Sequence, residues 1–275
     1  MSFSHTPLLV DRKAQTASRP VSPTHIGWGL SLGLWLLLVV GPLLGLPGAS
    51  LSPLASAQAQ ARIPEPTLRS TPRDEAWLKE DLARLAQNPK DPFLMREAAI
   101  SLNVVGAPDN WPYLQKSRAL LEEANKLEPN NPHILMFLGS TIAMLARHPD
   151  VGLFDKKSMV TSAFEYMDKA IELEPDSYRL RLMRGTANLG APSFFGRSKE
   201  LEADVALIRK TLELAPPADY PGHMKAAGYL LLGSYHEKKG ELNRAQAYWS
   251  KAIQHGKGTR YETQARKRLQ NVQAK

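Results

Sequence analysis

The sequence predicts an all-helical chain in which antiparallel helix pairs stack into a solenoid. One observation is a phrase that occurs twice, as Ala124–Pro129 (ANKLEP) and Ala170–Pro175 (AIELEP), each time closing an apolar, helix-patterned stretch. The two prolines lie 46 residues apart, a recurrence typical of stacked helical units. The other observation is that apolar residues recur at helical spacing along the chain, without a convincing strand alternation.

Local signals place the individual helices. Asp74 suits the acidic start of a helix, and leucines follow on one face at positions 78, 82 and 85. Prolines at 92, 132 and 221 fall at helix starts, where their missing N–H costs nothing. The predicted helices are 74–87, 92–105, 111–127, 132–147, 156–173, 177–189, 198–214, 222–239, 241–254 and 259–272.

The N-terminus predicts export from the cytoplasm. Residues 26–46 are an uncharged, mostly apolar run of 21 residues, and Arg12, Lys13 and Arg19 precede it. The small residues around Ala57 fit a signal peptidase site, so residues 1–57 are predicted to be a signal peptide cleaved after Ala57. The alternative is an uncleaved membrane anchor through 26–46, because that length spans a bilayer. Both alternatives place the remainder outside the cytoplasm, in the periplasm of a bacterium.

Composition limits what the remainder does. Residues 58–73 are rich in proline and read as an extended linker, whereas residues 74–275 read as one helical domain. The absence of cysteine excludes disulfides, thiolate metal sites and cysteine nucleophiles. The formal net charge of +8 is mild, and basic residues do not cluster with aromatic ones, so nucleic acid is not expected as a partner.

The helical domain resembles the tetratricopeptide repeat (TPR) family, whose units each pack a helix A against a helix B. The clearest copy has six residues that fit the family's pattern of large and small positions: Tyr229, Leu232, Gly233, Ala245, Trp249 and Ala252. A second copy fits at Leu135, Leu138, Gly139, Ala163, Met167, Ala170 and Pro175, with 12 extra residues between its halves. The resemblance implies repeats at approximately 92–129, 132–175, 178–217 and 226–257, and a capping helix at 258–273.

Two arginines depart from the repeat pattern and are candidate ligand-binding residues. Arg181 and Arg184 share a helix face at positions where the motif has bulky apolar groups. A buried guanidinium requires carboxylates or carbonyls. One interpretation is that both arginines pair with neighbouring acidic residues or tie down the following loop. The other is that they line a pocket for an anionic group.

The loop that follows, residues 190–197, is a second departure. It holds Phe194 and Phe195 between a proline and a glycine, and Arg197 closes it. One hypothesis is that one ring is exposed and faces a ligand or partner, because two adjacent aromatic residues rarely enter one cavity. The alternative, which burial statistics favour, is that both rings fill gaps between units. Similar Phe-Phe-Gly loops occur in bacterial extracytoplasmic TPR proteins, including some that resemble the TPR component of TRAP-type solute transport systems.

The resemblance also implies a concave groove lined by helix A residues. The positions concerned are His133, Met136, Ser140, Ala143, Arg179, Leu182, Thr186, Leu189, Ala227, Leu230, Ser234 and Glu237. This mixed, lightly charged set favours a partner helix or an extended peptide with apolar anchors. It does not provide the Lys/Arg clamp with which TPR domains hold acidic C-termini.

Catalytic and metal-binding signals are weak. The sequence contains no Gly-x-Ser-x-Gly, P-loop or His-Glu-x-x-His motif, and His148, Asp150 and Asp155 are more typical of turns than of a metal site. We therefore expect no cofactor and no enzymatic activity. The sequence predicts a non-enzymatic extracytoplasmic scaffold for protein–protein interaction in the cell envelope. The alternative is an accessory component of a TRAP-type transport system that binds a small anionic ligand or the transporter's binding protein.

Overall fold

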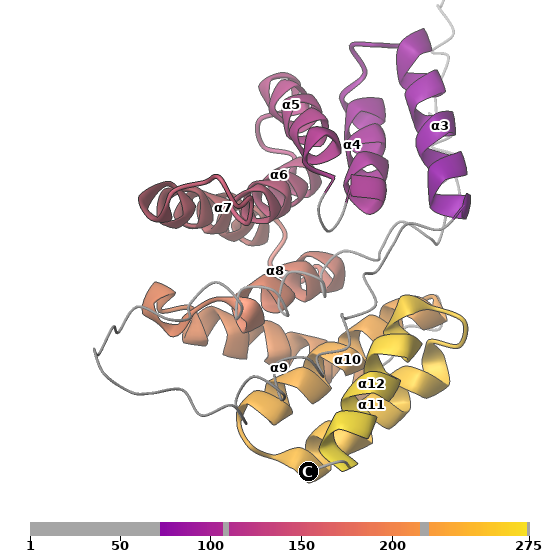
Figure 1. Ribbon diagram of the computed structural model, residues 1–275, viewed down its shortest axis with the longest axis vertical. Coiled ribbons are helices and arrows are strands. Elements are labelled where there is room, and N and C mark those ends of the chain that lie inside the picture. Colours follow the sequence, from indigo (N-terminus) through magenta and orange to yellow (C-terminus); the bar gives the residue numbers. More distant parts are fainter. Residues whose placement is uncertain (1–71, 107–109, 215–219, 274–275) are drawn as a thin grey trace, which may run out of the picture.

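A computed structural model describes residues 72–106, 110–214 and 220–273, and these residues form ten α-helices, one short 3-10 helix and no strand (Figure 1). The all-helical prediction is confirmed for this part of the chain. The elements are α3 (Pro72–Gln87), α4 (Pro92–Gly106), α5 (Trp111–Leu127), α6 (Pro132–Leu145), α7 (Leu153–Leu173), α8 (Tyr178–Gly190), η2 (Ser193–Phe195), α9 (Ser198–Leu214), α10 (Gly222–Lys238), α11 (Leu242–His255) and α12 (Arg260–Gln273).

Consecutive helices pack as neighbouring pairs. The most extensive contacts join α4 to α5, α6 to α7, α8 to α9 and α10 to α11, while α3 packs on α4 and α12 on α11. We call the first helix of each pair the A helix and the second the B helix. In Figure 1 the pairs follow one another from α3–α5 at the top, through α8 in the middle, to α10–α12 at the bottom. This arrangement is compatible with a TPR-like repeat.

The helix starts follow the local signals in the sequence. Pro132 occupies the first turn of α6, where the side chain of Asn131 accepts hydrogen bonds from the backbone N–H groups of His133 and Ile134. Pro92 begins α4 in the same way, after Asp91. Two starts come earlier than predicted. Helix α3 begins at Pro72, and α7 begins at Leu153, directly after Gly152.

The A and B helices differ in how deeply they are buried. Every residue of α6 from Ile134 to Leu145 is buried, whereas α7 buries only one face. Helix α10 is similarly buried through most of its length, and α11 buries three residues, among them Trp249. The A helices contact one another, α4 to α6, α6 to α8 and α8 to α10, as well as their B partners, and α10 also contacts α12. They therefore form an inner layer that the B helices cover.

Small residues allow the helices of a pair to approach closely, as the repeat pattern predicts. A side-chain carbon on Gly139 would meet the backbone oxygen of Ala163 and the side chain of Met167. A side-chain carbon on Gly233 would overlap the ring of Trp249, which is completely buried. The pairs α6–α7 and α10–α11 therefore depend on glycine at these two points.

The core divides into two clusters that meet at α8. One cluster gathers apolar side chains of α4 to α7 with Leu180 and Met183 of α8, and the other gathers those of α9 to α12 with Tyr178 and Leu182. Helix α8 thus presents one apolar face to each half of the domain. Its remaining side chains, which include three arginines, lie at the junction of the two halves.

The predicted signal or anchor segment, 1–57, lies outside the described residues, as does the predicted linker except for its last two positions. Within the described part of the chain, none of the helices combines the length and apolarity that a bilayer crossing requires.

Candidate functional site

Arg181 and Arg184, the candidate anion-binding pair, are bound to oxygens of the protein itself. Asp204 of α9 is completely buried and receives hydrogen bonds from Arg184 at 3.0 Å and 2.7 Å and from Arg181 at 3.1 Å. Arg181 also donates from Nε to the carbonyl oxygen of Pro175 at 2.7 Å. Burial raises the pKa of Asp204, and the two guanidiniums oppose this effect.

A second carboxylate completes the network. Arg184 donates its remaining nitrogen, Nη1, to Asp168 of α7 at 2.8 Å. Arg197 donates to both oxygens of Asp168, at 2.8 Å and 2.6 Å, and from Nε to the side-chain oxygen of Asn188 at 2.9 Å. All three guanidinium nitrogens of Arg184 are thereby engaged. The arrangement matches the first of the two interpretations, in which the arginines pair with acidic neighbours and tie down the following loop.

The Phe194–Phe195 loop presents one ring to solvent and one to the core. Phe194 is 65% exposed, while Phe195 packs edge-on against Phe164 of α7 with ring centroids 5.9 Å apart. The two rings touch each other, with centroids 4.5 Å apart. Gly196 ends the short helix η2 in the left-handed region, at φ 68°, which favours glycine. The exposure of Phe194 differs from the favoured expectation that both rings fill gaps, and fits the hypothesis that one of them is exposed.

The residues predicted to line a groove do not form an open surface. Six of them have exposed fractions between 0% and 6%: Met136, Ser140, Leu182, Thr186, Leu230 and Ser234. Glu237 is half-buried and accepts a hydrogen bond from Arg268 of α12. The expectation treated one face of each A helix as solvent-facing, but the A helices pack closely enough against their neighbours to bury it. These six positions therefore belong to the interior.

Four residues of the inner-layer helices have a buried polar atom without a hydrogen-bond partner: Asn103, His133, Arg179 and His223. Arg179 has a buried Nε atom without a hydrogen-bond acceptor, and His133 has a buried Nδ1 atom in the same situation. Both stand at predicted groove positions, but we did not single them out as binding residues. No local signal separates Arg179 from Arg181 and Arg184, because the difference depends on which carboxylates the fold brings to each.

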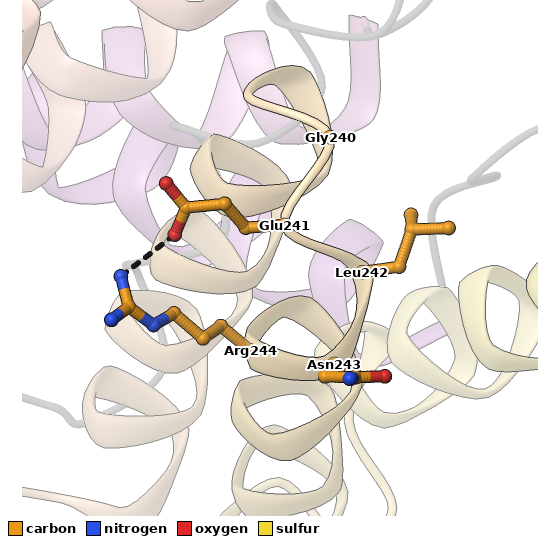
Figure 2. A pocket seen from close by; sticks show the side chains of 5 residues that line it. All are labelled: Gly240, Glu241, Leu242, Asn243 and Arg244. Atoms are coloured by element: carbon orange, nitrogen blue, oxygen red, sulfur yellow. Dashed lines mark hydrogen bonds and ion pairs between the residues drawn. The ribbon is translucent and has the colours of Figure 1, made fainter.

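A shallow hollow lies at the turn between α10 and α11 (Figure 2). Its lining residues are Gly240, Glu241, Leu242, Asn243 and Arg244. The Glu241 carboxylate contacts Nδ1 of His236 at 2.9 Å and accepts from Arg244 at 2.8 Å, and these two contacts lower the pKa of Glu241. The charged groups that line the hollow pair with residues of the protein itself. The hollow therefore resembles a turn stabilised by ion pairs more than a ligand site.

Large apolar side chains are exposed at two of the A–B connections. Leu153 and Phe154, in the first turn of α7, are 67% and 87% exposed. They follow the A–B connection of the α6–α7 pair, and Phe194 lies in the A–B connection of the α8–α9 pair. Helices α6 and α8 contact each other, so the two connections belong to adjacent pairs. We call Leu153, Phe154 and Phe194 the apolar end.

Metal binding finds no support in the described residues. They contain no group of three or more His, Asp or Glu side chains that could hold a metal ion. His148 instead accepts a hydrogen bond from the backbone N–H of Asp150 and packs its ring against Trp111, which is the behaviour of a turn residue.

Comparisons with known proteins do not supply an identity. No family model matches the chain, and it matches neither a curated protein nor a solved structure. The class that the fold itself defines is an all-helical protein of packed helix pairs.

Proposed function

We propose that this chain is a non-enzymatic, TPR-like scaffold of the bacterial cell envelope that binds another protein. The apolar end carries the proposal, because its three large side chains stand exposed on adjacent A–B connections. Contiguous exposed apolar groups mark protein interaction sites, and the proposal requires these three side chains to meet one partner. Aromatic residues such as Phe154 and Phe194 are also enriched in protein interfaces.

The proposed binding surface is the apolar end, and not the groove that the sequence predicted. The inner-layer positions are buried, so a partner would have to separate packed helices to reach them. Phe154 and Phe194 require no such rearrangement. The extracytoplasmic location rests on the apolar run 26–46 and the small residues near Ala57, outside the described residues, and stays a prediction from the sequence.

Site-specific photocrosslinking in cells tests the proposal. A photoreactive phenylalanine analogue is placed at position 154 or 194 of the full chain, and at Leu214 as a matched control. Leu214 is 76% exposed and ends α9, at the opposite end of its helix pair. We expect a discrete protein adduct from 154 and 194 and none from 214.

A double substitution makes the test more specific. Alanine at both Leu153 and Phe154 should reduce the adduct formed from position 194, because the three side chains would share one partner. Absence of an adduct at 154 and 194, or the same adducts at 214, would contradict the proposal.

A second candidate function is that of a transport accessory protein that binds a small anionic ligand or the transporter's binding protein. The Nε atom of Arg179, which is buried without a hydrogen-bond acceptor, favours this candidate, since a buried polar group without a partner is costly unless a ligand satisfies it. The similarity of the Phe194–Gly196 loop to loops of TRAP-associated TPR proteins supports it further.

A further inference from the structure

Positive charge is concentrated in the C-terminal helices. Residues 222–275 contain 11 lysines and arginines and 3 acidic residues, which gives a net charge of +8. Residues 72–221 contain 19 basic and 22 acidic residues, which gives a net charge of −3. The excess therefore belongs to α10, α11 and α12, which lie together at the bottom of Figure 1. A charge asymmetry of this size within one chain indicates an anionic partner for its basic part.

Three lysines of this region gather where α10 begins and α11 ends. The two helix termini are in close contact, because a side-chain carbon on Gly222 would meet the backbone oxygen of His255 at 2.7 Å. Burial, and then the charges of Lys225 and Lys251, lower the pKa of His255, so both lysines lie near that ring. Lys257 follows His255 by two residues. We call Lys225, Lys251 and Lys257 the basic end.

The charge of the basic end is not neutralised by ion pairs. Within the described residues, no carboxylate forms an ion pair with any of its three lysines. Two carboxylates lie in this region and bind other groups. Glu262 accepts hydrogen bonds from the backbone N–H of Gly258 at 2.7 Å and from Arg266 at 2.9 Å, and Glu213 accepts one from the hydroxyl of Tyr248 at 2.6 Å. The basic end therefore keeps a positive excess.

The lysines of the basic end stand over side chains that are packed together. Lys251 and Lys257 are exposed, and Lys225 is half-buried. The ammonium group of Lys251 lies 5.4 Å from the centre of the Tyr229 ring and 5.5 Å from that of Tyr248. These two rings stack on each other with their centroids 6.3 Å apart. A lysine stem that covers aromatic rings leaves its charge in water, where a broad anionic surface can meet it.

We propose that the basic end binds the anionic headgroups of a phospholipid bilayer. This binding adds a second surface to the proposed scaffold, and it rests on the location of that scaffold in the cell envelope. Leu214 is 76% exposed and directly follows Glu213, so it supplies a large apolar side chain beside the lysines. Peripheral membrane binding combines attraction between charges with the burial of apolar groups at the interface. Because Phe194 lies at the opposite end of this helix pair, bilayer contact leaves it accessible to a protein.

Three observations favour a bilayer over nucleic acid or an acidic protein. All three cations are lysines, whereas arginine is the residue suited to bidentate binding of phosphates and carboxylates. Tyr229, Trp249 and Tyr261, which belong to the same helices, are buried and offer no free face on which bases could stack. The apolar run 26–46 also directs the chain to a membrane. If that run is retained, residues 47–71 reach at most about 80 Å, which lets the domain turn its basic end to the bilayer.

Energy transfer from the protein to labelled lipids tests the basic end. Because the sequence contains no cysteine, a single introduced cysteine carries the donor fluorophore, at Gln254 on the exposed side of α11 or at Gln115 on that of α5. The full chain is reconstituted into nanodiscs of phosphatidylcholine, with or without about 30% phosphatidylglycerol, and a few headgroups carry the acceptor. Phosphatidylglycerol should increase the transfer from position 254 about twofold or more and leave that from position 115 unchanged.

Charge variants show whether the lysines cause this increase. Glutamine at all three lysines of the basic end should abolish it, and so should a rise in salt from about 50 to about 500 mM. The matched control places glutamine at Lys90, Lys116 and Lys169, which are exposed in the N-terminal half, and should keep the increase. Equal transfer from position 254 in the two lipid compositions would overturn the proposal. An equal loss in the control variant would overturn it as well.

Two further measurements separate membrane binding from a folding defect and from protein binding. Since the three lysines form no ion pairs, their replacement should leave the unfolding temperature unchanged, as followed by circular dichroism. The photoreactive residue at position 214 should give lipid adducts in nanodiscs with phosphatidylglycerol. A protein adduct there that disappears in the lysine variant would assign the basic end to an acidic protein and overturn the proposal. Crosslinks from positions 154 and 194 do not depend on these lysines, so the scaffold function and the membrane contact can fail separately.

Discussion

The pairs α8–α9 and α10–α11 share one geometry and fill it with opposite chemistry. In each, a glycine of the A helix faces the B helix. Gly233 lies against Trp249, and Gly185 lies against the side chain of Asp204. Trp249 and Asp204 are both completely buried, so one pair has an indole at its centre and the other a carboxylate. A stacked helix pair thus requires close approach at one point, and the group that fills the point can be apolar or charged.

The two helix pairs differ in the interactions that stabilise their buried central side chain. Trp249 is stabilised by removing a large apolar surface from water, while its indole Nε1 atom is buried without a hydrogen-bond partner. Asp204 loses its hydration and depends on the donors of Arg181, Arg184 and Asn188. The stability of the α8–α9 pair should therefore fall strongly when one ionic partner is removed. It should change little when both members of the buried pair are replaced by apolar residues.

The largest effect is expected from Trp249→Ala. Removal of a fully buried indole leaves a cavity beside Gly233 and should lower the free energy of unfolding by about 3–5 kcal/mol. Chemical denaturation followed by circular dichroism measures this loss. Trp111→Ala, which truncates a partly buried tryptophan of α5, is the control and should cost clearly less. Equal losses in the two variants would contradict the central role of Trp249.

A loss of about 3 kcal/mol is expected from Asp204→Asn, which leaves two arginines without their carboxylate. Glu202→Gln is a matched control on the same helix. Glu202 is exposed and pairs only with Lys239, at 3.3 Å, so its loss should be below about 1 kcal/mol.

The double variant Arg184→Met with Asp204→Leu separates the charge from the volume. Because both members of the buried pair are replaced by apolar groups, its stability should return to within about 1 kcal/mol of the unsubstituted chain. Asp168 keeps Arg197, and Arg181 keeps the carbonyl of Pro175. If the loss of stability in the double variant equalled the sum of the losses in the two single variants, apolar residues could not replace the ionic network, and the prediction would be wrong.

The smallest effect is expected at the α10–α11 turn. His236 and then Arg244 lower the pKa of Glu241 below its ordinary value of 4.5 in the folded chain. Its contribution to stability is thus present at neutral pH and lost as the pH falls through that lowered value. NMR titration of the Glu241 carboxyl should give a midpoint below 4.5. Arg244→Gln should raise the midpoint, and an unchanged midpoint would exclude Arg244 as a cause.

The sequence by itself determined the helices and the points where they meet. Helical periodicity, prolines in first turns and caps such as Asn131 act over a few residues, so they can be read without knowing the fold. The pairing of small with large residues, Gly233 with Trp249, belongs to the same repeat pattern. The exposure of one ring of the Phe194–Phe195 loop was left open by the sequence, because burial statistics favoured two buried rings.

The tertiary structure alone decided which polar groups are satisfied. Arg184 donates to Asp168 and Asp204, which lie 16 and 20 residues away in the chain, while the buried Nε atom of Arg179 on the same helix has no acceptor in the described residues. The predicted groove residues became interior because successive A helices pack on each other, a contact that no single repeat encodes. Burial and ion pairing depend on distances between elements, whereas periodicity and capping depend on neighbours in the chain.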